Sequence, residues 1–487
     1  MGLLHTATEL PKQLFINNEY VDPKHSVKRS LYNPATGELV ADDVPVAGEQ
    51  DVDYAVDCAE KAFPAWKKVS PTQRRDILLK FASLVEEHAT ELAAMTRLTL
   101  GSPVKFNEFE IALAVDAMRY YIGWIDKFNG ESFPQDDGFL KIIRNEPLGV
   151  TAGIVPWNGP LITLGMKGAP ALVTGNCFIF KPSEKTPFAA IALGALAKEA
   201  GLPPGVFQVL PGDGTTGALL ASHMRVRKIS FTGSIATGKK IQELAAKSNL
   251  KRVTLELGGK SPSLVFNDCD LDNAVRWTVD GIALNAGQVC MAASKVYVQE
   301  GIYQKFVDKY VAYMKEKATT IGDPRDEKTE IGPLVDEGQY NRVRGFIERE
   351  KQGKGKLLVG GPREGVRGYY IDPTVFAEPD LDSEIHTQEI FGPVSVIHRF
   401  KTEEEALELA NNSEFGLMAG VFTQDINKAL RVASDIDSGM VGINCVTLNF
   451  ITAPFGGSKQ SGIGRECGIS ALKAFTELKT VMINLTY

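Results

Sequence analysis

Cys290 is the residue with the clearest potential for covalent chemistry, and it lies in the segment "NAGQVCMAAS", residues 285–294. Its neighbours Ala286, Gly287, Ala292 and Ala293 are all small. A cysteine thiolate is a good nucleophile toward a carbonyl carbon. A cysteine is also a small apolar residue that is often simply buried in a core. The local sequence therefore leaves two interpretations open, a catalytic nucleophile and an inert packed thiol.

A second group of residues has the spacing of a dinucleotide-binding site. The segment "GDGTTG", residues 212–217, matches G-x-G-x-x-G between a strand-like run and a helical one. The segment "FTGSIATG" places Gly233, Ser234 and Thr237 where another helix is expected to begin. Free backbone N–H groups at a helix start attract a pyrophosphate. These glycine-rich turns predict contacts with the phosphates of a dinucleotide.

The acidic residue that should accompany such glycines is not in its usual place. The ordinary pattern has an acid about 20 positions later, at the end of the next strand. That strand ends in "KISFTG", which contains no acid. The preceding strand-like run, "FIFKPSEKTP", ends instead with Lys181, Ser183 and Glu184. Since strand carboxyl ends face the ligand crevice of an open sheet, Glu184 is a candidate for binding the adenosine ribose, with a plain polar loop as the alternative.

Two series of strand and helix patterns are expected to hold these residues in position. Between residues 147 and 256, short apolar runs alternate with helical patterns, and the runs do not alternate between polar and apolar residues. Such runs are typical of parallel strands covered on both faces. A similar series follows from residue 261 to residue 445. The sequence therefore predicts an α/β protein with a Rossmann-like cofactor domain and a second α/β catalytic domain.

The remaining segments are long helices and two isolated strands. Residues 70–101 read as one helix with Ser70 as its cap, and a second helix is expected over 107–128. The segments "DGFLKIIRNEPLG" and "ELKTVMINLTY" read as strands with no neighbouring strand pattern. An isolated strand needs a sheet to join, and a neighbouring subunit is one source of such a sheet. These segments favour an oligomer and a small β arm.

Composition restricts the classes of partner. The 487 residues carry a net charge of −7, which argues against binding to nucleic acid or to an anionic membrane surface. The six cysteines contain no C-x-x-C pair and do not suggest a disulfide framework. No apolar run reaches the about 18 residues of a membrane span, and the first residues lack the pattern of a signal peptide. We expect a cytoplasmic protein without a metal site.

Seven motifs occur in an order that resembles the NAD(P)-dependent aldehyde dehydrogenase family, in particular its broad, non-acylating, hydrolytic members. They are "PWN" at 156–158, "KPSEKTP" at 181–187, "FTGS" at 231–234, "ELGGKSP" at 256–262, "GQVC" at 287–290, "EIFGPV" at 389–394 and "PFGGSKQSGIGRE" at 454–466. The resemblance covers nearly the whole chain. It implies an enzyme that oxidises an aldehyde to the carboxylic acid with NAD, or with NADP.

The resemblance implies a role for each of four catalytic residues. Cys290 would attack the aldehyde, and Asn158 with the backbone N–H of Cys290 would bind the resulting oxyanion. Glu256 would act as the general base that activates water for thioester hydrolysis. Lys181 belongs to this set and, with Glu184, would hold the adenosine ribose. The small neighbours of Cys290 would leave room for substrate and cofactor at the sulfur.

The resemblance also implies which residues line the cofactor and substrate sites. The expected cofactor residues are Ile154, Val155, Pro156, Trp157, Lys181, Ser183, Glu184, Gly214, Gly217, Phe231, Gly233, Ser234, Thr237, Leu257, Gly258, Glu389 and Phe391. Glu389 would bind the nicotinamide ribose and Phe391 would lie against the ring. The expected substrate residues are Gly159, Met166, Val289, Met291, Asn449 and Phe455.

Three of the substrate positions depart from the family pattern. Gly159 and Asn449 stand where an aromatic residue is frequent, and Met166 stands where many members have tryptophan. Smaller side chains at these positions predict a wider tunnel and a bulky substrate, an aromatic or branched aldehyde. "FTGSIATG" also lacks the acidic residue that usually follows the serine and threonine.

The implied domain limits are 1–126 and 147–256 for the NAD(P)-binding domain, and 257–456 for the catalytic domain. The oligomerisation arm would comprise 127–146 and 468–487, in a homodimer or homotetramer. One alternative is a relative that passes the acyl group to coenzyme A, although such members typically lack the glutamate that is present here as Glu256. A non-catalytic binding or structural relative is the other, but Cys290, Glu256 and Asn158 are all retained.

Overall fold

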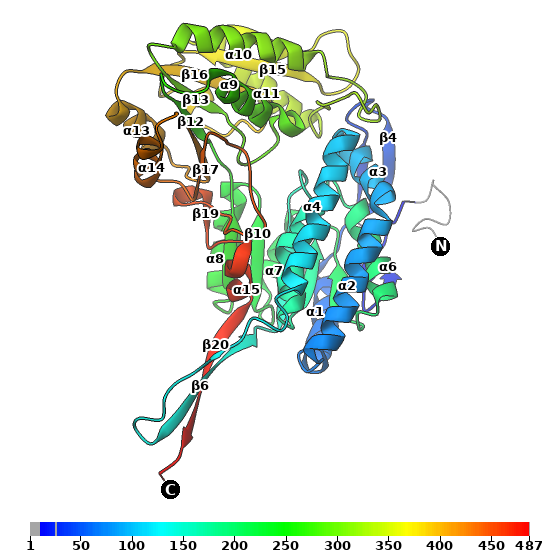
Figure 1. Cartoon of the computed structure of the whole chain (residues 1–487). Helices are drawn as coiled ribbons and strands as arrows, with labels where there is room; N and C mark the ends of the chain where they lie inside the picture. The colour runs from blue at the N-terminus through cyan, green and yellow to red at the C-terminus, as the bar shows by residue number, and fades with distance from the viewer. Residues whose placement is uncertain (1–9, 25–26, 487) are drawn as a thin grey trace.

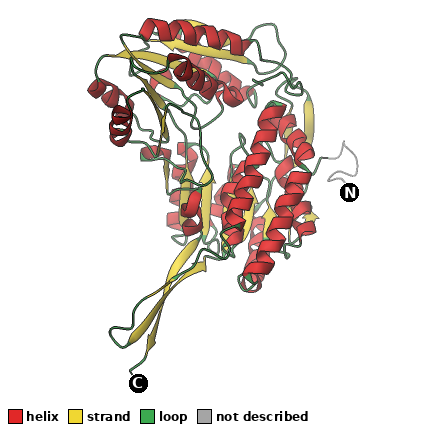
Figure 2. Ribbon diagram, in the orientation of Figure 1, coloured by secondary structure: helices red, strands yellow, loops and turns green. Residues whose placement is uncertain are grey.

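The computed structural model of the chain describes residues 10–24 and 27–486 (Figures 1 and 2). Most of the amino-terminal stretch on which the expectation of no signal peptide rests therefore lies outside the described residues. In the described part of the chain, no helix is both long and apolar enough to cross a lipid bilayer. The strands form two large sheets, a three-stranded arm and a small two-stranded hairpin.

The first large sheet contains the predicted Rossmann-like strands. Its central strands are parallel, in the order β11-β10-β7-β8-β9. They span Val150–Ile154 (β7), Cys177–Lys181 (β8), Phe207–Val209 (β9), Lys228–Thr232 (β10) and Arg252–Glu256 (β11). Antiparallel strands extend both edges, with β1 (Leu14–Ile16) and β2 (Glu19–Val21) beside β9, and β19 (Gly462–Ile463) beside β11. The predicted fold class is confirmed for this part of the chain.

Helices pack around this sheet, and one of them differs from the sequence prediction. Residues 70–101 form two helices rather than one, α2 (Pro71–Glu87) and α3 (Ala89–Leu100), which meet at His88 with φ −101° and ψ 19°. Ser70 does cap α2, accepting from the N–H of Gln73. The apolar stripe continues through both helices, so periodicity alone does not reveal the break. The others are α1 (Glu49–Trp66), α4 (Val104–Ile122), α5 (Ala169–Val173), α6 (Phe188–Ala200), α7 (Gly214–Ser222) and α8 (Ile235–Lys247).

The second large sheet forms the upper part of the molecule in Figure 1. Its order is β14-β15-β16-β13-β12-β17-β18, and every pair except β14–β15 is parallel. The strands are β12 (Pro262–Val265), β13 (Lys295–Gln299), β14 (Lys356–Pro362), β15 (Ile371–Ala377), β16 (Val394–Phe400), β17 (Met418–Phe422) and β18 (Met440–Ile443). The accompanying helices are α9 (Leu271–Ala283), α10 (Tyr303–Ala318), α11 (Glu337–Glu350), α12 (Glu384–Thr387), α13 (Glu403–Asn411) and α14 (Ile426–Asp435). The last helix, α15 (Gly468–Ala474), packs instead with the elements of the first sheet. The sequence did not reveal β14 and β15.

The two strands that the sequence left without a neighbour pair with each other. β6 (Phe139–Pro147) and β20 (Thr476–Asn484) are antiparallel along their whole lengths, and β5 (Glu131–Ser132) adds a short third strand. Figure 1 shows them as an arm that projects from the body of the molecule. A neighbouring subunit is therefore not needed to complete their pairing. A separate hairpin consists of β3 (Lys28–Tyr32) and β4 (Leu39–Pro45).

The strand order creates a crevice in the first sheet. β7 has β8 on one side and β10 on the other, so successive connections leave it in opposite directions. Ligands of open α/β sheets bind at such a switch point, beyond the carboxyl ends of the strands. The segments that leave β7 and β10 there are residues 155–158 and 233–234. The domain limits given above stay a prediction.

Candidate active site

Cys290 follows a turn with an unusual backbone. Three consecutive residues before it, Asn285, Ala286 and Gly287, have φ values of 49°, 54° and 71°. Left-handed conformations are unfavourable for residues with a side chain, and they persist where the surrounding structure holds them. At Gly287 an added Cβ would lie 2.1 Å from the carbonyl oxygen of Gly392. The turn is thus held against the 389–394 segment, and it fixes the position of the sulfur.

The glycine pair of "ELGGKSP" brings three functional segments together. A Cβ at Gly259 would lie 2.3 Å from the carbonyl oxygen of Cys290, and a Cβ at Gly258 would lie 2.3 Å from Oε2 of Glu389. The Gly259 N–H donates to Oε1 of Glu389 over 3.1 Å. Only glycine allows backbones to approach this closely. The motif therefore joins Glu256 at the end of β11 to the nucleophile and to the predicted ribose-binding carboxylate.

Asn158 lies beside the nucleophile turn. Its Nδ2 donates to the carbonyl oxygen of Gln288 over 2.9 Å, and Nδ2 of Asn285 approaches the Asn158 carbonyl oxygen at 3.4 Å. Asn158 and Cys290 line the same two cavities. The second N–H of a side-chain amide remains a possible donor to an oxyanion. This arrangement has the components of an oxyanion hole.

The environment of Cys290 disfavours its thiolate. Desolvation by the surrounding protein, followed by the nearby carboxyl groups of Glu389 and Glu256, raises the pKa of the Cys290 thiol to about 12. Backbone N–H groups of Cys290 and Met291 act in the opposite direction. The thiol is therefore protonated at neutral pH, and its attack on a carbonyl needs a proton acceptor.

Glu256 has the properties of such an acceptor. It is 2% exposed, and neither carboxyl oxygen has a hydrogen-bond partner in the part of the chain that the structure describes. Burial raises the pKa of Glu256 well above its usual value, the charge of Glu466 raises it further, and Lys167 and Arg465 oppose these effects. A carboxyl group with raised pKa and free oxygens is suited to accept a proton near neutral pH.

A buried ion pair beside Glu256 was not predicted from the sequence. Lys167 pairs with Oε1 of Glu466, and Ser230 Oγ donates to the same oxygen over 2.8 Å. Glu466 is the last residue of the motif "PFGGSKQSGIGRE", which contributed to the family resemblance without predicting a role for Glu466. Lys167 lies in an apolar helical run where no pattern distinguishes it. Only the fold brings Lys167 and Glu466 together.

One cavity contains all six predicted substrate residues. Its volume is about 140 Å³, and Cys290 and Asn158 line one part of it. Gly159, Met166, Val289, Met291, Asn449 and Phe455 are all part of its wall. The sequence did not indicate Phe106, Phe109, Glu110, Leu113, Ile162, Thr163, Thr232, Leu284 and Glu466, which also line it. Most of these side chains are apolar, which suits a hydrophobic substrate.

A second cavity of about 200 Å³ meets Cys290 from the cofactor side. Eight of the predicted cofactor residues line it, Pro156, Trp157, Gly233, Ser234, Leu257, Gly258, Glu389 and Phe391. Thr232, Gln339 and Arg342 line it without having been predicted. The rings of Trp157 and Phe391 meet edge to face with centroids 5.2 Å apart. Burial raises the pKa of Glu389 to about 7.

The other predicted cofactor residues do not line this cavity. They are Ile154, Val155, Lys181, Ser183, Glu184, Gly214, Gly217, Phe231 and Thr237, all within the described residues. Some of them lie together, since a Cβ at Gly217 would be 3.9 Å from side-chain atoms of both Ile154 and Lys181. Ser183 Oγ donates to Oε2 of Glu184 over 3.2 Å at the end of β8. That the whole set binds the cofactor stays a prediction.

The two helix starts differ in their readiness for a phosphate. At α7 the side chain of Asp213 already accepts from the N–H of Thr215, and it pairs with Arg29 over 2.7 Å. The "GDGTTG" motif thus contains the start of α7, and the carboxylate of Asp213 already occupies that helix start. The start of α8 is capped by the neutral hydroxyl of Ser234. These differences make the start of α8 the more suitable of the two for a phosphate group.

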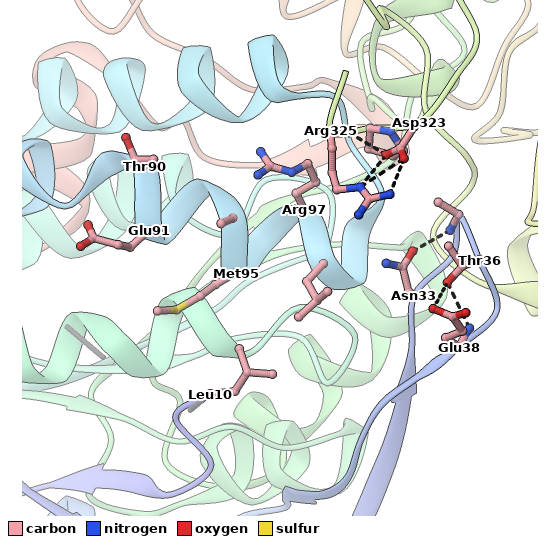
Figure 3. Close-up of a pocket in the computed structure, with 14 residues that line it drawn as sticks. Leu10, Asn33, Thr36, Glu38, Thr90, Glu91, Met95, Arg97, Asp323 and Arg325 are labelled. Atoms are coloured by element: carbon pink, nitrogen blue, oxygen red, sulfur yellow. Dashed lines mark hydrogen bonds and ion pairs between the residues drawn. The ribbon is translucent and has the colours of Figure 1, made fainter. Parts of the chain in front are cut away.

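A larger cavity lies elsewhere. It has a volume of about 610 Å³. Figure 3 shows the residues that line it, most of which come from α3, the turn of the β3–β4 hairpin and the segment with the Asp323–Arg325 ion pair. All the predicted site residues lie in the described part of the chain, and none of them lines this cavity. Within residues 10–24 and 27–486, no group of three or more His, Cys, Asp or Glu side chains could hold a metal ion.

A parallel sheet with a crevice at its switch point, beside a second α/β domain, is typical of the class of α/β enzymes that use a dinucleotide. Comparison with known proteins is more specific, because the model of the "Aldehyde dehydrogenase family" matches residues 20–481. The chain belongs to this family, and it is an NAD(P)-dependent aldehyde dehydrogenase.

The chain is 46% identical over 479 residues to human (Homo sapiens) "Retinal dehydrogenase 2", which covers 97% of this chain and 92% of that protein. It is 43% identical to an aldehyde dehydrogenase of Agaricus bisporus, over 99% of this chain and 96% of the relative. A P. syringae indole-3-acetaldehyde dehydrogenase, solved with NAD+ and IAA, superposes with a TM-score of 0.95 at 37% identity, covering 98% and 97% of the two chains.

Proposed function

We propose that this enzyme oxidises a bulky aldehyde, aromatic or branched, to its carboxylic acid through a covalent adduct on Cys290. The observation that carries this proposal is the meeting of two cavities at Cys290, one lined by the predicted substrate residues and the other by residues of the dinucleotide crevice. An aldehyde and a hydride acceptor can thus approach the same sulfur from two sides.

The first step is attack of the Cys290 sulfur on the carbonyl carbon. Glu256 takes the thiol proton, because its carboxyl oxygens are free of partners in the described chain and its pKa is raised. The carbonyl oxygen becomes an oxyanion held by Asn158 Nδ2 and the backbone N–H of Cys290. Preoriented donors of this kind lower the barrier most when they are shielded from water.

Bound NAD+ supplies the hydride acceptor for the oxidation. Ser234 and the start of α8 would hold its pyrophosphate, Lys181 and Glu184 would hold its adenosine ribose, and Glu389 would hold its nicotinamide ribose. The carboxylate of Glu184 repels a 2′-phosphate, which favours NAD, while Lys181 keeps some use of NADP open. Once the first proton has passed to solvent, the Glu256 carboxylate accepts a proton from the water that attacks the thioester; the C–S bond breaks, the carboxylic acid is released and the Cys290 thiol regains a proton.

The walls of the substrate cavity support a bulky substrate. Gly159 contributes no side chain, and Met166 and Asn449 contribute side chains smaller than an aromatic ring system. Apolar side chains dominate the remaining wall. Two relatives carry retinal and indole-3-acetaldehyde in their names, and both of these aldehydes are large and unsaturated.

A panel of aldehydes assayed with NAD and with NADP tests this proposal. We expect kcat/KM for ring-bearing aldehydes to exceed that for acetaldehyde by about ten-fold or more, because apolar contacts contribute roughly 1–3 kcal/mol per added group. A strong preference for acetaldehyde would reject the bulky-substrate proposal. Acyl-CoA formed when coenzyme A is added would reject the hydrolytic route.

The arm supports a homodimer or homotetramer. β20 is an edge strand, and Leu478 and Met482 on it are 73% and 69% exposed. An edge with exposed apolar side chains pairs readily with another chain. Sedimentation velocity measures the size of the assembly.

A further inference from the structure

Glu110 is a buried acid in the substrate cavity to which the mechanism above assigns no role, and unlike Glu466 it has no ion pair in the described chain. It lies on α4, is 3% exposed, and lines the cavity that contains Cys290. Phe106, Phe109 and Leu113 of the same helix form apolar wall around it. A carboxyl group is costly to bury among such side chains unless its oxygens find partners.

Within the described part of the chain, only one of the two carboxyl oxygens of Glu110 has hydrogen-bond partners. Oε1 accepts from the backbone N–H groups of Leu161 and Ile162, over 2.7 and 3.2 Å. Oε2 is shielded from water and has no hydrogen-bond partner in the described part of the chain. No ion pair of Glu110 occurs there either. A buried acceptor without a partner is unfavourable, so a bound molecule that supplies a donor would gain from meeting it.

Gly159 keeps the cavity open toward this carboxyl group. A Cβ at position 159 would lie 3.9 Å from Glu110 Oε1 and 3.0 Å from Cγ2 of Ile162. Gly159 itself lines the cavity next to Asn158. Because it has no side chain, position 159 places nothing between the substrate space and Glu110. Gly159, where a wider tunnel is predicted, and the Glu110 carboxyl group therefore lie in the same region of the cavity wall.

We propose that Glu110 determines substrate specificity by accepting a hydrogen bond from a hydroxyl or ring N–H of the aldehyde. This inference rests on the proposed function and adds a polar group to the expected substrate. The polar group is a donor, since an ionised carboxylate only accepts. The two backbone N–H groups on Oε1 favour the ionised form. Burial raises the pKa of Glu110 to about 7, so the carboxylate predominates in assays above that pH.

Matched arylacetaldehydes test the inference. Hydroxyphenylacetaldehydes with the hydroxyl at the meta or para position are each compared with the methyl and methoxy analogues, which have no donor. We expect the wild-type enzyme to favour one hydroxyl isomer over its methyl analogue by about ten-fold or more in kcat/KM, because a hydrogen bond to a charged group discriminates at this level.

Two variants separate binding of the substrate from support of the fold. Glu110→Gln keeps an oxygen for the N–H groups of Leu161 and Ile162 but replaces Oε2 by a donor. It should lose the preference for the hydroxyl and gain relative activity on the methoxy analogue. A purely structural role would not reverse the preference. Glu108→Gln, an exposed change on the same helix, serves as the matched control and should keep the wild-type ratio.

A second route to the same readout leaves Glu110 unchanged. Gly159→Val fills the space in front of the carboxyl group and should lower the hydroxyl preference. Equal kcat/KM for hydroxyl and methyl analogues in the wild type would overturn the inference while leaving the proposed function intact, as would an unaltered ratio in Glu110→Gln. Failure of the wild type to oxidise any of these aldehydes would overturn both.

Discussion

At the scale of single residues, the reactivity of Cys290 depends on its neighbours more than on its own ionisation. Its surroundings raise the pKa of the thiol to about 12, whereas reactive cysteines are usually associated with a lowered pKa. The carboxyl groups of Glu256 and Glu389 contribute to this rise. We infer that the thiol stays neutral until it transfers its proton to Glu256 as a substrate arrives.

Replacing the nucleophile is the most direct test of the covalent route. We expect Cys290→Ala to lower kcat on the order of 10⁴-fold or more, because loss of a nucleophile removes the covalent pathway as a whole. Binding of NAD, measured by fluorescence titration, should persist. Cys445→Ala, a change at a cysteine that lines neither cavity at the site, is the control and should retain activity. Full oxidation by Cys290→Ala would contradict the mechanism.

The pH dependence follows from the two raised pKa values. Glu256 and Cys290 both hold protons at low pH, and attack requires that the thiol lose its proton to an ionised carboxylate. We therefore expect kcat/KM to rise with pH through the neutral range. Glu256→Gln should shift this rise to higher pH and lower the rate near neutrality by about 10²–10⁴-fold. A profile that falls with rising pH in the wild type would argue against this assignment.

At the scale of elements, glycines position the site where backbones meet. The pair Gly258 and Gly259 allows the strand end that carries Glu256 to contact both the Cys290 turn and the Glu389 carboxylate. The sequence showed these segments as separate motifs. Their meeting point depends on the switch between β7 and β10 and on the approach of the second sheet, neither of which is encoded in a local pattern.

Adding a methyl group at this meeting point should disturb catalysis more than folding. In Gly259→Ala the new Cβ would lie 2.3 Å from the Cys290 carbonyl oxygen, so the nucleophile turn must move. We expect kcat to fall about 10²-fold, because misplacement of reacting groups by about 1 Å has that effect. Gly338→Ala is the control, since its Cβ meets only Asp336 Oδ1 at 3.4 Å. Comparable kcat values for both variants would refute the packing argument, provided that thermal unfolding confirms folded proteins.

Strands and helices were predicted correctly where a pattern of neighbouring residues defines them. The prediction failed where a tertiary contact or a local change of backbone conformation decides the structure. The five parallel strands of the first sheet were readable as apolar runs. The break at His88 was not, because the apolar stripe of α2 continues in α3. The "GDGTTG" motif matched a phosphate-binding pattern, yet Asp213 caps the helix that it begins.

At the scale of the whole molecule, the arm projects from the body, and its strands pair only with one another among the described residues. Its three strands pair with each other, but β20 leaves one edge open and exposes Leu478 and Met482. Because β6 and β20 pair with each other, an unpaired strand no longer favours an oligomer. The exposed apolar side chains of β20 favour one instead. A second copy of this chain is the partner that we expect to cover them.

Charge on this edge should weaken the assembly. We expect the double variant Leu478→Asp, Met482→Asp to shift the protein toward monomers, because charges on an edge strand oppose pairing with another chain. Sedimentation velocity compares the variant with the wild type. Leu250→Asp, a change at a residue that is 81% exposed and lies outside the arm, is the control. A wild-type protein that sediments as a monomer would rule out the oligomer proposal.

The sequence by itself determined the fold class, the family resemblance and the residues most suited to chemistry, because strand runs, helix caps and short motifs depend on neighbours in the chain. It did not reveal the Lys167–Glu466 pair, the burial of Glu110 in the wall of the substrate cavity or the pairing of β6 with β20. These depend on residues that are distant in sequence, and a buried lysine or glutamate carries no local sign of its burial. Only the packing of the tertiary structure decided which side chains share a cavity and which carboxyl oxygens remain without a partner.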